Sequence, residues 1–202
     1  MTTCTLVAFD GMDVLDAGGP YEVLLTAARL LARDGQPVQL RIVVAAKEAG
    51  EVQAYGGLGL VATQALADVD ATDLLIVPGA IDTTILTDDA ELLAHVGRLA
   101  DTATITLSVC TGAFLLAAAG LLSDQPWTTH HEDVEALAGL LGPKGARTGV
   151  RWVDSGRIVT AAGLSSGIAG ALHVVERLYG RNLAERTARQ IEYDWEPSAD
   201  AS

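Results

Sequence analysis

The sequence contains few cysteines and few basic residues. Cys4 and Cys110 are the only cysteines among 202 residues, too few to hold together a small secreted protein by disulfides. Thirteen Lys and Arg stand against 26 Asp and Glu, the formal net charge is −13, and no basic cluster interrupts this excess, so we expect no nucleic acid partner. The first residues lack the basic and apolar regions of a signal peptide, which predicts a cytoplasmic protein.

The uncharged stretch 104–123 is long enough to raise the question of a membrane span. Residues 105–109 alternate and are rich in β-branched side chains, whereas 113–119 consists of good helix formers. Neither flank carries an excess of Lys and Arg. We therefore interpret the stretch as a buried strand, a tight turn and a buried helix, and expect no membrane association. A second uncharged run repeats this design, with a strand at 158–161, a turn at 162–167 and a helix from Ile168.

The rest of the chain also alternates between apolar strand patterns and amphipathic helix patterns. Half of the residues are apolar and 19% are charged, which excludes a disordered chain. We expect further strands at 5–9, 38–46, 74–77 and 150–154, a small hairpin at 52–62, and helices from Gly19 to Gly35 with Pro20 at the first position, at 88–101, at 132–141 and at 184–191. This order predicts one α/β domain over residues 1–202, with a mostly parallel sheet between layers of helices.

Cys110 occupies the turn between the strand 105–109 and the next helix. A residue at such a junction lies at the carboxyl edge of a parallel sheet, where open α/β sheets bind ligands. The N-terminus of the following helix favours a thiolate, and small residues at 108 and 111–113 leave room for a sharp bend. We predict a cysteine nucleophile elbow, the alternative being a buried structural cysteine. Cys4 has no turn or base beside it and is expected to be structural.

Asp16 is the candidate proton donor. It lies in a glycine-rich, apolar segment just before the helix expected from Gly19, and burial there would raise the pKa of its carboxyl, as a general acid requires. The alternative is an aspartate that caps the helix. His130 and His131 follow a possible helix-capping pair and could approach Cys110 only through tertiary folding. Adjacent histidines diverge and no third ligand follows at metal spacing, so no metal site is expected.

Several segments resemble the ThiJ/PfpI superfamily, and within it the isonitrile hydratases. The similarity to the isonitrile hydratases in particular rests on Asp16 before Gly-Pro, combined with Cys-Thr-Gly at 110–112. The resemblance covers nearly the whole chain and implies a flavodoxin-like, class I glutamine amidotransferase-like fold and a homodimer. The segments that resemble it are 15–23 (LDAGGPYEV), 73–79 (DLLIVPG), 108–122 (SVCTGAFLLAAAGLL), 128–130 (TTH), 160–168 and 190–193 (QIEY).

This resemblance implies hydration of a small isonitrile to the N-substituted formamide without a metal or organic cofactor. Cys110 would form a thioimidate, and Asp16 would act as general acid and then general base. Backbone N–H groups of Gly79 and Thr111 would stabilise charge, with the Thr111 hydroxyl as an added donor. The residues expected to surround the substrate are Gly79, Ala80, Thr111 and Gly112.

Two other functions remain open at this point. One is an enzyme of the same fold that acts on α-oxoaldehydes. The other is a non-enzymatic ligand-binding or redox-sensing protein in which Cys110 is oxidised or only lines a pocket. Members of the superfamily with a Cys-His-Glu triad often carry a histidine directly after the cysteine, whereas Thr111 stands there in this chain. A triad is therefore not expected, and a contribution from His130 or His131 stays open.

Overall fold

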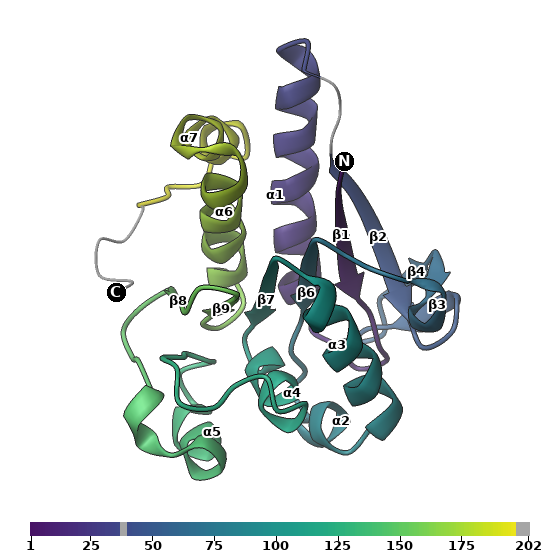
Figure 1. Cartoon of the computed structure of the whole chain (residues 1–202), viewed down its shortest axis with the longest axis vertical. Coiled ribbons are helices and arrows are strands. Elements are labelled where there is room, and N and C mark those ends of the chain that lie inside the picture. Colours follow the sequence, from purple (N-terminus) through teal and green to yellow (C-terminus); the bar gives the residue numbers. More distant parts are fainter. Residues whose placement is uncertain (37–39, 197–202) are drawn as a thin grey trace.

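A seven-stranded sheet forms the centre of the protein, seen in a computed structural model that describes residues 1–36 and 40–196 (Figure 1). Neighbouring strands run parallel, except that β8 is antiparallel to β9. A separate antiparallel hairpin joins β3 (Gly50–Gln53) to β4 (Gly59–Ala62), which confirms the expected hairpin. In spatial order the strands of the sheet are β5 (Gln64–Ala65), β2 (Leu40–Ala46), β1 (Thr2–Val7), β6 (Leu74–Val77), β7 (Ile105–Val109), β9 (Ile158–Ala161) and β8 (Trp152–Asp154).

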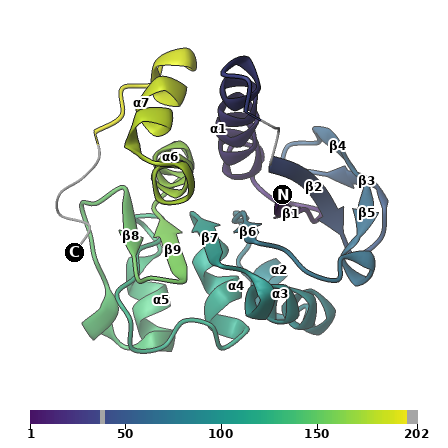
Figure 2. The same ribbon diagram turned by 45° about the horizontal axis from the view of Figure 1, so that its top comes forward.

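Helices cover both faces of this sheet, as Figure 2 shows. In α3 the residues Leu92, Val96 and Leu99 recur at helical spacing and are all buried, which is why this segment forms a helix against the sheet. None of the helices among the described residues is both long and apolar enough to cross a membrane. One face carries α1 (Val14–Arg33), α6 (Ser166–Tyr179) and α7 (Arg181–Gln190), and the other carries α2 (Thr84–Thr87), α3 (Ala90–Thr102), α4 (Gly112–Ala118) and α5 (Val134–Leu141). The predicted α/β architecture is confirmed.

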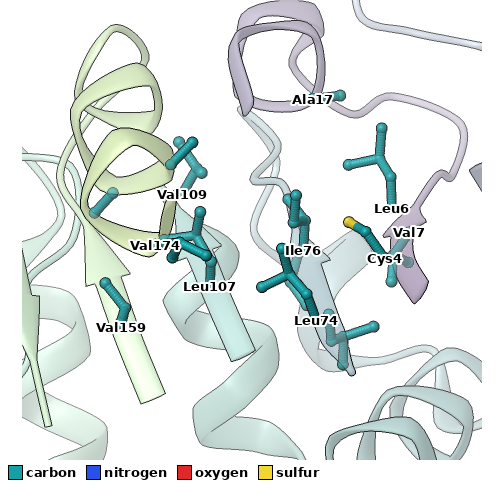
Figure 3. Close-up of a cluster of buried hydrophobic side chains, with 14 of the residues drawn as sticks. Cys4, Leu6, Val7, Ala17, Leu74, Ile76, Leu107, Val109, Val159 and Val174 are labelled. Atoms are coloured by element: carbon teal, nitrogen blue, oxygen red, sulfur yellow. The ribbon is translucent and has the colours of Figure 1, made fainter. Parts of the chain in front are cut away.

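The central strands are apolar along their whole length because helices cover both of their faces. Every residue of β6 and β7 is buried. Cys4 of β1 lies among the apolar side chains of this core, close to Leu6 and Ile76 (Figure 3). Its side chain is fully buried, and burial raises the pKa of its thiol well above the ordinary range. Both observations agree with a structural role for Cys4.

Helix α1 begins earlier than we expected. It starts at Val14, after Asp13, so the expectation of a start at Gly19 with Pro20 at the first position is wrong. Proline inside a helix removes one backbone hydrogen bond. The segment before Pro20 is nevertheless helical because residues such as Ala17 are buried there, and tertiary packing outweighs local preference.

Other element boundaries differ by a few residues. The strand expected at 38–46 is described from Leu40, and its first two residues lie outside the described part of the chain. Helix α5 begins at Val134 with Asp133 before it, so the expectation that Thr128 and Thr129 cap this helix is wrong. The elements missed from the sequence are β5, α2 and the two 3₁₀ turns Leu66–Asp68 and Pro143–Gly145, all too short for a periodic pattern.

Three adjacent parallel strands bring the candidate site residues to one edge of the sheet. The segments that leave the carboxyl ends of β1, β6 and β7 carry Asp16, Gly79 and Cys110, respectively. The sheet extends from β1 to β2 on one side and to β6 on the other. The site therefore lies at the point where the strand order reverses, which is where open α/β sheets bind ligands.

This edge of the sheet is closely packed at Gly112. A Cβ atom at Gly112 would overlap the carbonyl oxygens of Val77 and Pro78 at the end of β6. We therefore expect Gly112→Ala to lower the free energy of unfolding by about 1–3 kcal/mol, measured by urea denaturation. Gly97→Ala is the matched control, since Gly97 lies inside α3 with open space around it and alanine should be neutral or stabilising there. Equal stability of the two variants would contradict the proposed close packing.

Candidate active site

Cys110 forms a strained turn between β7 and α4. Its φ of 56° lies in the left-handed region, which costs a residue with a side chain about 1–2 kcal/mol. Two kinds of hydrogen bond hold the turn: the Cys110 N–H donates to the carbonyls of Ala161 (3.1 Å) and Ala162 (3.0 Å), and the Thr129 hydroxyl donates to the Cys110 carbonyl (2.8 Å). The sharp bend that we expected is present. The side chain is less accessible than expected, because Cys110 is only 8% exposed.

Asp16 lies in the first turn of α1 and is fully buried. Its Oδ2 accepts a hydrogen bond from the Gly79 N–H (3.0 Å), and the Cys110 side chain and the Leu164 backbone both lower the pKa of its carboxyl. Asp13, not Asp16, precedes the helix, so the alternative of a helix-capping Asp16 is wrong. Among the described residues, Oδ1 of Asp16 accepts no hydrogen bond of ordinary geometry. A buried carboxyl oxygen without a donor costs stability, and such groups gather at functional sites.

Asp16 and Cys110 perturb each other's titration. The pKa of Asp16 is raised to about 7, mainly by burial. The hydrogen bond from Gly79 lowers this pKa, and the negative charge of Asp13 raises it. The pKa of Cys110 is raised to about 12, mainly by burial and to a smaller extent by the negative charge of Asp16. The Thr111 N–H at the start of α4 lowers the pKa of Cys110, as we expected of a helix N-terminus, but desolvation outweighs this effect and the thiol prevails over the thiolate.

The two groups consequently titrate as a pair. Below about pH 7 the pair holds two protons, and above it the pair holds one. The single proton can reside on sulfur, beside a carboxylate, or on the carboxyl, beside a thiolate. The protonation state of Cys110 therefore depends on that of Asp16.

Two donors that we expected to face the substrate are engaged within the protein. The Gly79 N–H donates to Asp16, and the Thr111 hydroxyl donates to the Ala80 carbonyl (2.7 Å) while accepting from the Ala80 N–H (2.9 Å). They fix the turn after β6 instead of meeting a ligand. A Cβ at Gly79 would overlap Thr111 and crowd Asp16, so glycine is required there.

Leu164 is a site residue that the sequence reasoning missed. It lies in the turn between β9 and α6, and its φ of 46° is again left-handed. The backbone N–H groups of Leu164 and Thr111 both act on the Cys110 sulfur and lower the pKa of its thiol. The repeated strand, turn and helix pattern at 158–172 was the available signal, because parallel strands of one sheet end at the same edge.

A pocket of about 180 Å³ opens beside Cys110. It is smaller than the cavities of roughly 300–1,000 Å³ that hold drug-sized ligands, so it suits a small substrate. A larger hollow of about 410 Å³ lies at the ends of β1 and β2, but Cys110 does not line it, and Asp16 lines neither of the two cavities. The residues that line the smaller pocket are Asp13, Ala80, Ile81, Cys110, Thr111, His130, Glu132, Asp133 and Leu164.

His130 reaches this pocket, whereas His131 is exposed and does not line it. The Nδ1 of His130 lies 3.2 Å from Oδ2 of Asp133, and its ring packs closely on Gly163. The histidine is therefore held as part of the pocket wall. Within the parts of the chain that are described, no three His, Cys, Asp or Glu side chains converge as metal ligands.

Comparison with known proteins agrees with this geometry. The isonitrile hydratase of Pseudomonas putida is 31% identical over 195 residues, which cover 96% of this chain and 79% of that protein. A ThiJ/PfpI family protein from Pseudomonas syringae superposes with a TM-score of 0.84 at 28% identity, covering 98% of this chain and 78% of the other. Drosophila melanogaster DJ-1beta shares the fold, with a TM-score of 0.81 at 17% identity over 96% of this chain and 99% of that one. Since the DJ-1/PfpI family profile matches residues 2–177, the chain belongs to the DJ-1/PfpI family.

Proposed function

We propose that the protein is an isonitrile hydratase that converts an isonitrile, R–N≡C, to the N-substituted formamide. The observation that carries the proposal is a fully buried Asp16 carboxyl, with its pKa raised to about 7, beside Cys110, which itself lines a small pocket. The 31% identity to an isonitrile hydratase supports the substrate class. We further propose that the protein acts as a cytoplasmic homodimer without a metal or organic cofactor, as the family resemblance implies.

The first half of the reaction needs an acid and a nucleophile at the same atom. The terminal carbon of an isonitrile becomes electrophilic only as it receives a proton. In the state with the proton on Asp16 and the negative charge on Cys110, the carboxyl gives its proton to this carbon while the sulfur forms a bond to it. The product is a thioimidate, R–N=CH–S, attached to Cys110, and Asp16 is left as a carboxylate.

The second half returns both groups to their starting state. The Asp16 carboxylate takes a proton from water as the water oxygen attacks the thioimidate carbon, and this proton passes to the nitrogen. The tetrahedral adduct then expels the Cys110 thiolate, and the hydroxyl proton returns to Asp16. The formamide leaves with the carbon-bound hydrogen from Asp16 and the nitrogen-bound hydrogen from water. The N–H groups of Thr111 and Leu164 support the thiolate at both ends of the cycle.

An ultraviolet assay of formamide formation from an aryl isonitrile tests the proposal directly. Methylglyoxal as the competing substrate separates it from an α-oxoaldehyde enzyme of the same fold. Turnover of methylglyoxal without turnover of the isonitrile would favour that enzyme. Inactivity toward both, with stable oxidation of Cys110 to the sulfinate, would favour a redox-sensing protein.

Replacing the thiol should abolish activity. We expect Cys110→Ala and Cys110→Ser to be folded but inactive, because the covalent step requires the sulfur. Iodoacetamide should modify Cys110 before Cys4, since Cys4 is fully buried and Cys110 borders a pocket; peptide mass spectrometry reports the order. His130→Ala should retain activity within about tenfold of the wild type, because His130 only shapes the wall. Activity in Cys110→Ala, or its complete loss in His130→Ala, would contradict the mechanism.

Asp16→Asn should separate proton transfer from packing. The amide keeps the shape of the side chain but carries no exchangeable acidic proton, so we expect kcat to fall by roughly a hundredfold or more. Stability should not fall: burial raises the pKa of Asp16 from about 4 in the unfolded chain to about 7, so ionisation opposes folding increasingly from pH 4 to pH 7. Thermal unfolding at about pH 8 should thus find the variant at least as stable as the wild type. Near-normal turnover would exclude Asp16 as the acid.

The dependence of kcat/KM on pH should follow the protonation state of the Asp16–Cys110 pair. The reactive state, with a thiolate beside a protonated carboxyl, holds one proton in total, as does the prevailing state with a thiol beside a carboxylate. Its population therefore follows the one-proton form of the pair, which accumulates above the Asp16 pKa of about 7. We therefore expect kcat/KM to rise as the pH is raised through about 7 and then to level off, because the Cys110 pKa lies at about 12. Initial rates across this range, in buffers of constant ionic strength, give the profile. A rate that falls through neutral pH would show that the form with two protons reacts.

A further inference from the structure

The mouth of the Cys110 pocket is acidic. Three carboxylates line it, from Asp13, Glu132 and Asp133, and the described lining residues include no Lys or Arg. Asp133 lies 3.2 Å from His130, while the carboxyl of Glu132 is exposed and makes no ion pair with any described residue. The pocket mouth therefore has an excess of negative charge close to the path that a substrate takes.

Apolar side chains complete the same mouth. Ile81 is 64% exposed and Leu164 is 38% exposed, and both line the pocket. Large apolar groups that remain exposed beside a small pocket provide contact area for the part of a ligand that stays outside it. The reacting isonitrile group has to reach Cys110, so the R group remains among these apolar side chains and carboxylates.

Building on the proposed hydratase function, we propose that Asp13, Glu132 and Asp133 select isonitriles by the charge of the R group. A cationic R group is favoured, an uncharged one is accepted and an anionic one is rejected. Carboxylates within one Debye length of a ligand charge, roughly 8–10 Å, act on it with little screening. The net charge of −13 makes the approach of an anion unfavourable from any direction, and the acidic mouth concentrates that effect at the site.

Glu132 is the appropriate position for a test, because Asp13 also influences the titration of Asp16. We would measure kcat/KM for isocyanoacetate, methyl isocyanoacetate and 2-(trimethylammonio)ethyl isocyanide, which carry a negative charge, no charge and a permanent positive charge. Glu132→Gln should raise the ratio of anionic to neutral substrate and lower the ratio of cationic to neutral substrate, each by about threefold, and salt should reduce both effects.

The matched control is Glu135→Gln. Glu135 is an exposed residue of α5 that does not line the pocket, and the substitution removes the same charge. Its ratios should shift by less than those of Glu132→Gln, because Glu135 does not line the pocket. Equal turnover of the anionic and cationic substrates by the wild type, or the same ratios in Glu132→Gln and Glu135→Gln, would overturn the proposal.

A second measurement does not depend on hydration. The thiol of Cys110 can be modified by methanethiosulfonates that carry a trimethylammonium or a sulfonate group, with Cys110→Ser as the blank. The ratio of cationic to anionic modification rates should fall about threefold in Glu132→Gln and by less in Glu135→Gln. If this ratio shifts but no isonitrile is hydrated, the proposed function fails while the acidic mouth still selects by charge. If isonitriles are hydrated and neither ratio shifts, the charge selection alone is wrong.

Discussion

Asp16 and Cys110 are buried beside each other at the carboxyl edge of the sheet, and the local structure keeps them there. A carboxyl group without full hydrogen bonding is costly inside a protein. Only the Gly79 N–H offsets this cost with a hydrogen bond of ordinary geometry among the described residues. The remaining cost appears as the raised pKa values of both groups. The same desolvation that destabilises the fold also raises the pKa of Asp16 to about 7, so the stability of this site and the proposed acid catalysis oppose each other.

Backbone strain and glycine together make the close approach possible. Cys110 and Leu164 both adopt left-handed φ values, and each begins or precedes a helix that follows a parallel strand. Side chains at Gly79 and Gly112 would collide with the neighbouring backbone. Strain of this kind persists only where the surrounding structure overdetermines it, here through the hydrogen bonds of Cys110 with Ala161 at the end of β9, with Ala162 and with Thr129.

The fold could be predicted from the sequence because alternating strand and helix patterns have only a few compact solutions. Burial of Asp16 and the turn at Cys110 were also predictable, since a glycine-rich segment and a run of small residues mark them. The pKa of Cys110 and the engagement of Gly79 and Thr111 were not. Those depend on hydrogen bonds between segments far apart in the sequence, and on a desolvation effect that exceeds the effect of the helix N-terminus. No local sequence pattern encodes either of them. Leu164 was missed because leucine is not a residue type associated with left-handed turns.

The engaged donors bear on which chemistry suits the site. Acyl transfer develops negative charge on a carbonyl oxygen and needs free hydrogen-bond donors directed at that oxygen. Here the Gly79 N–H and the Thr111 hydroxyl are bonded to Asp16 and Ala80, the Thr111 N–H acts on sulfur, and the Leu164 N–H acts on both the sulfur and the Asp16 carboxyl. Hydration of an isonitrile starts with proton transfer to carbon and forms no oxyanion in that step. A buried acid beside a thiol, in a site whose donors support sulfur, therefore fits a substrate that must be protonated before it can be attacked.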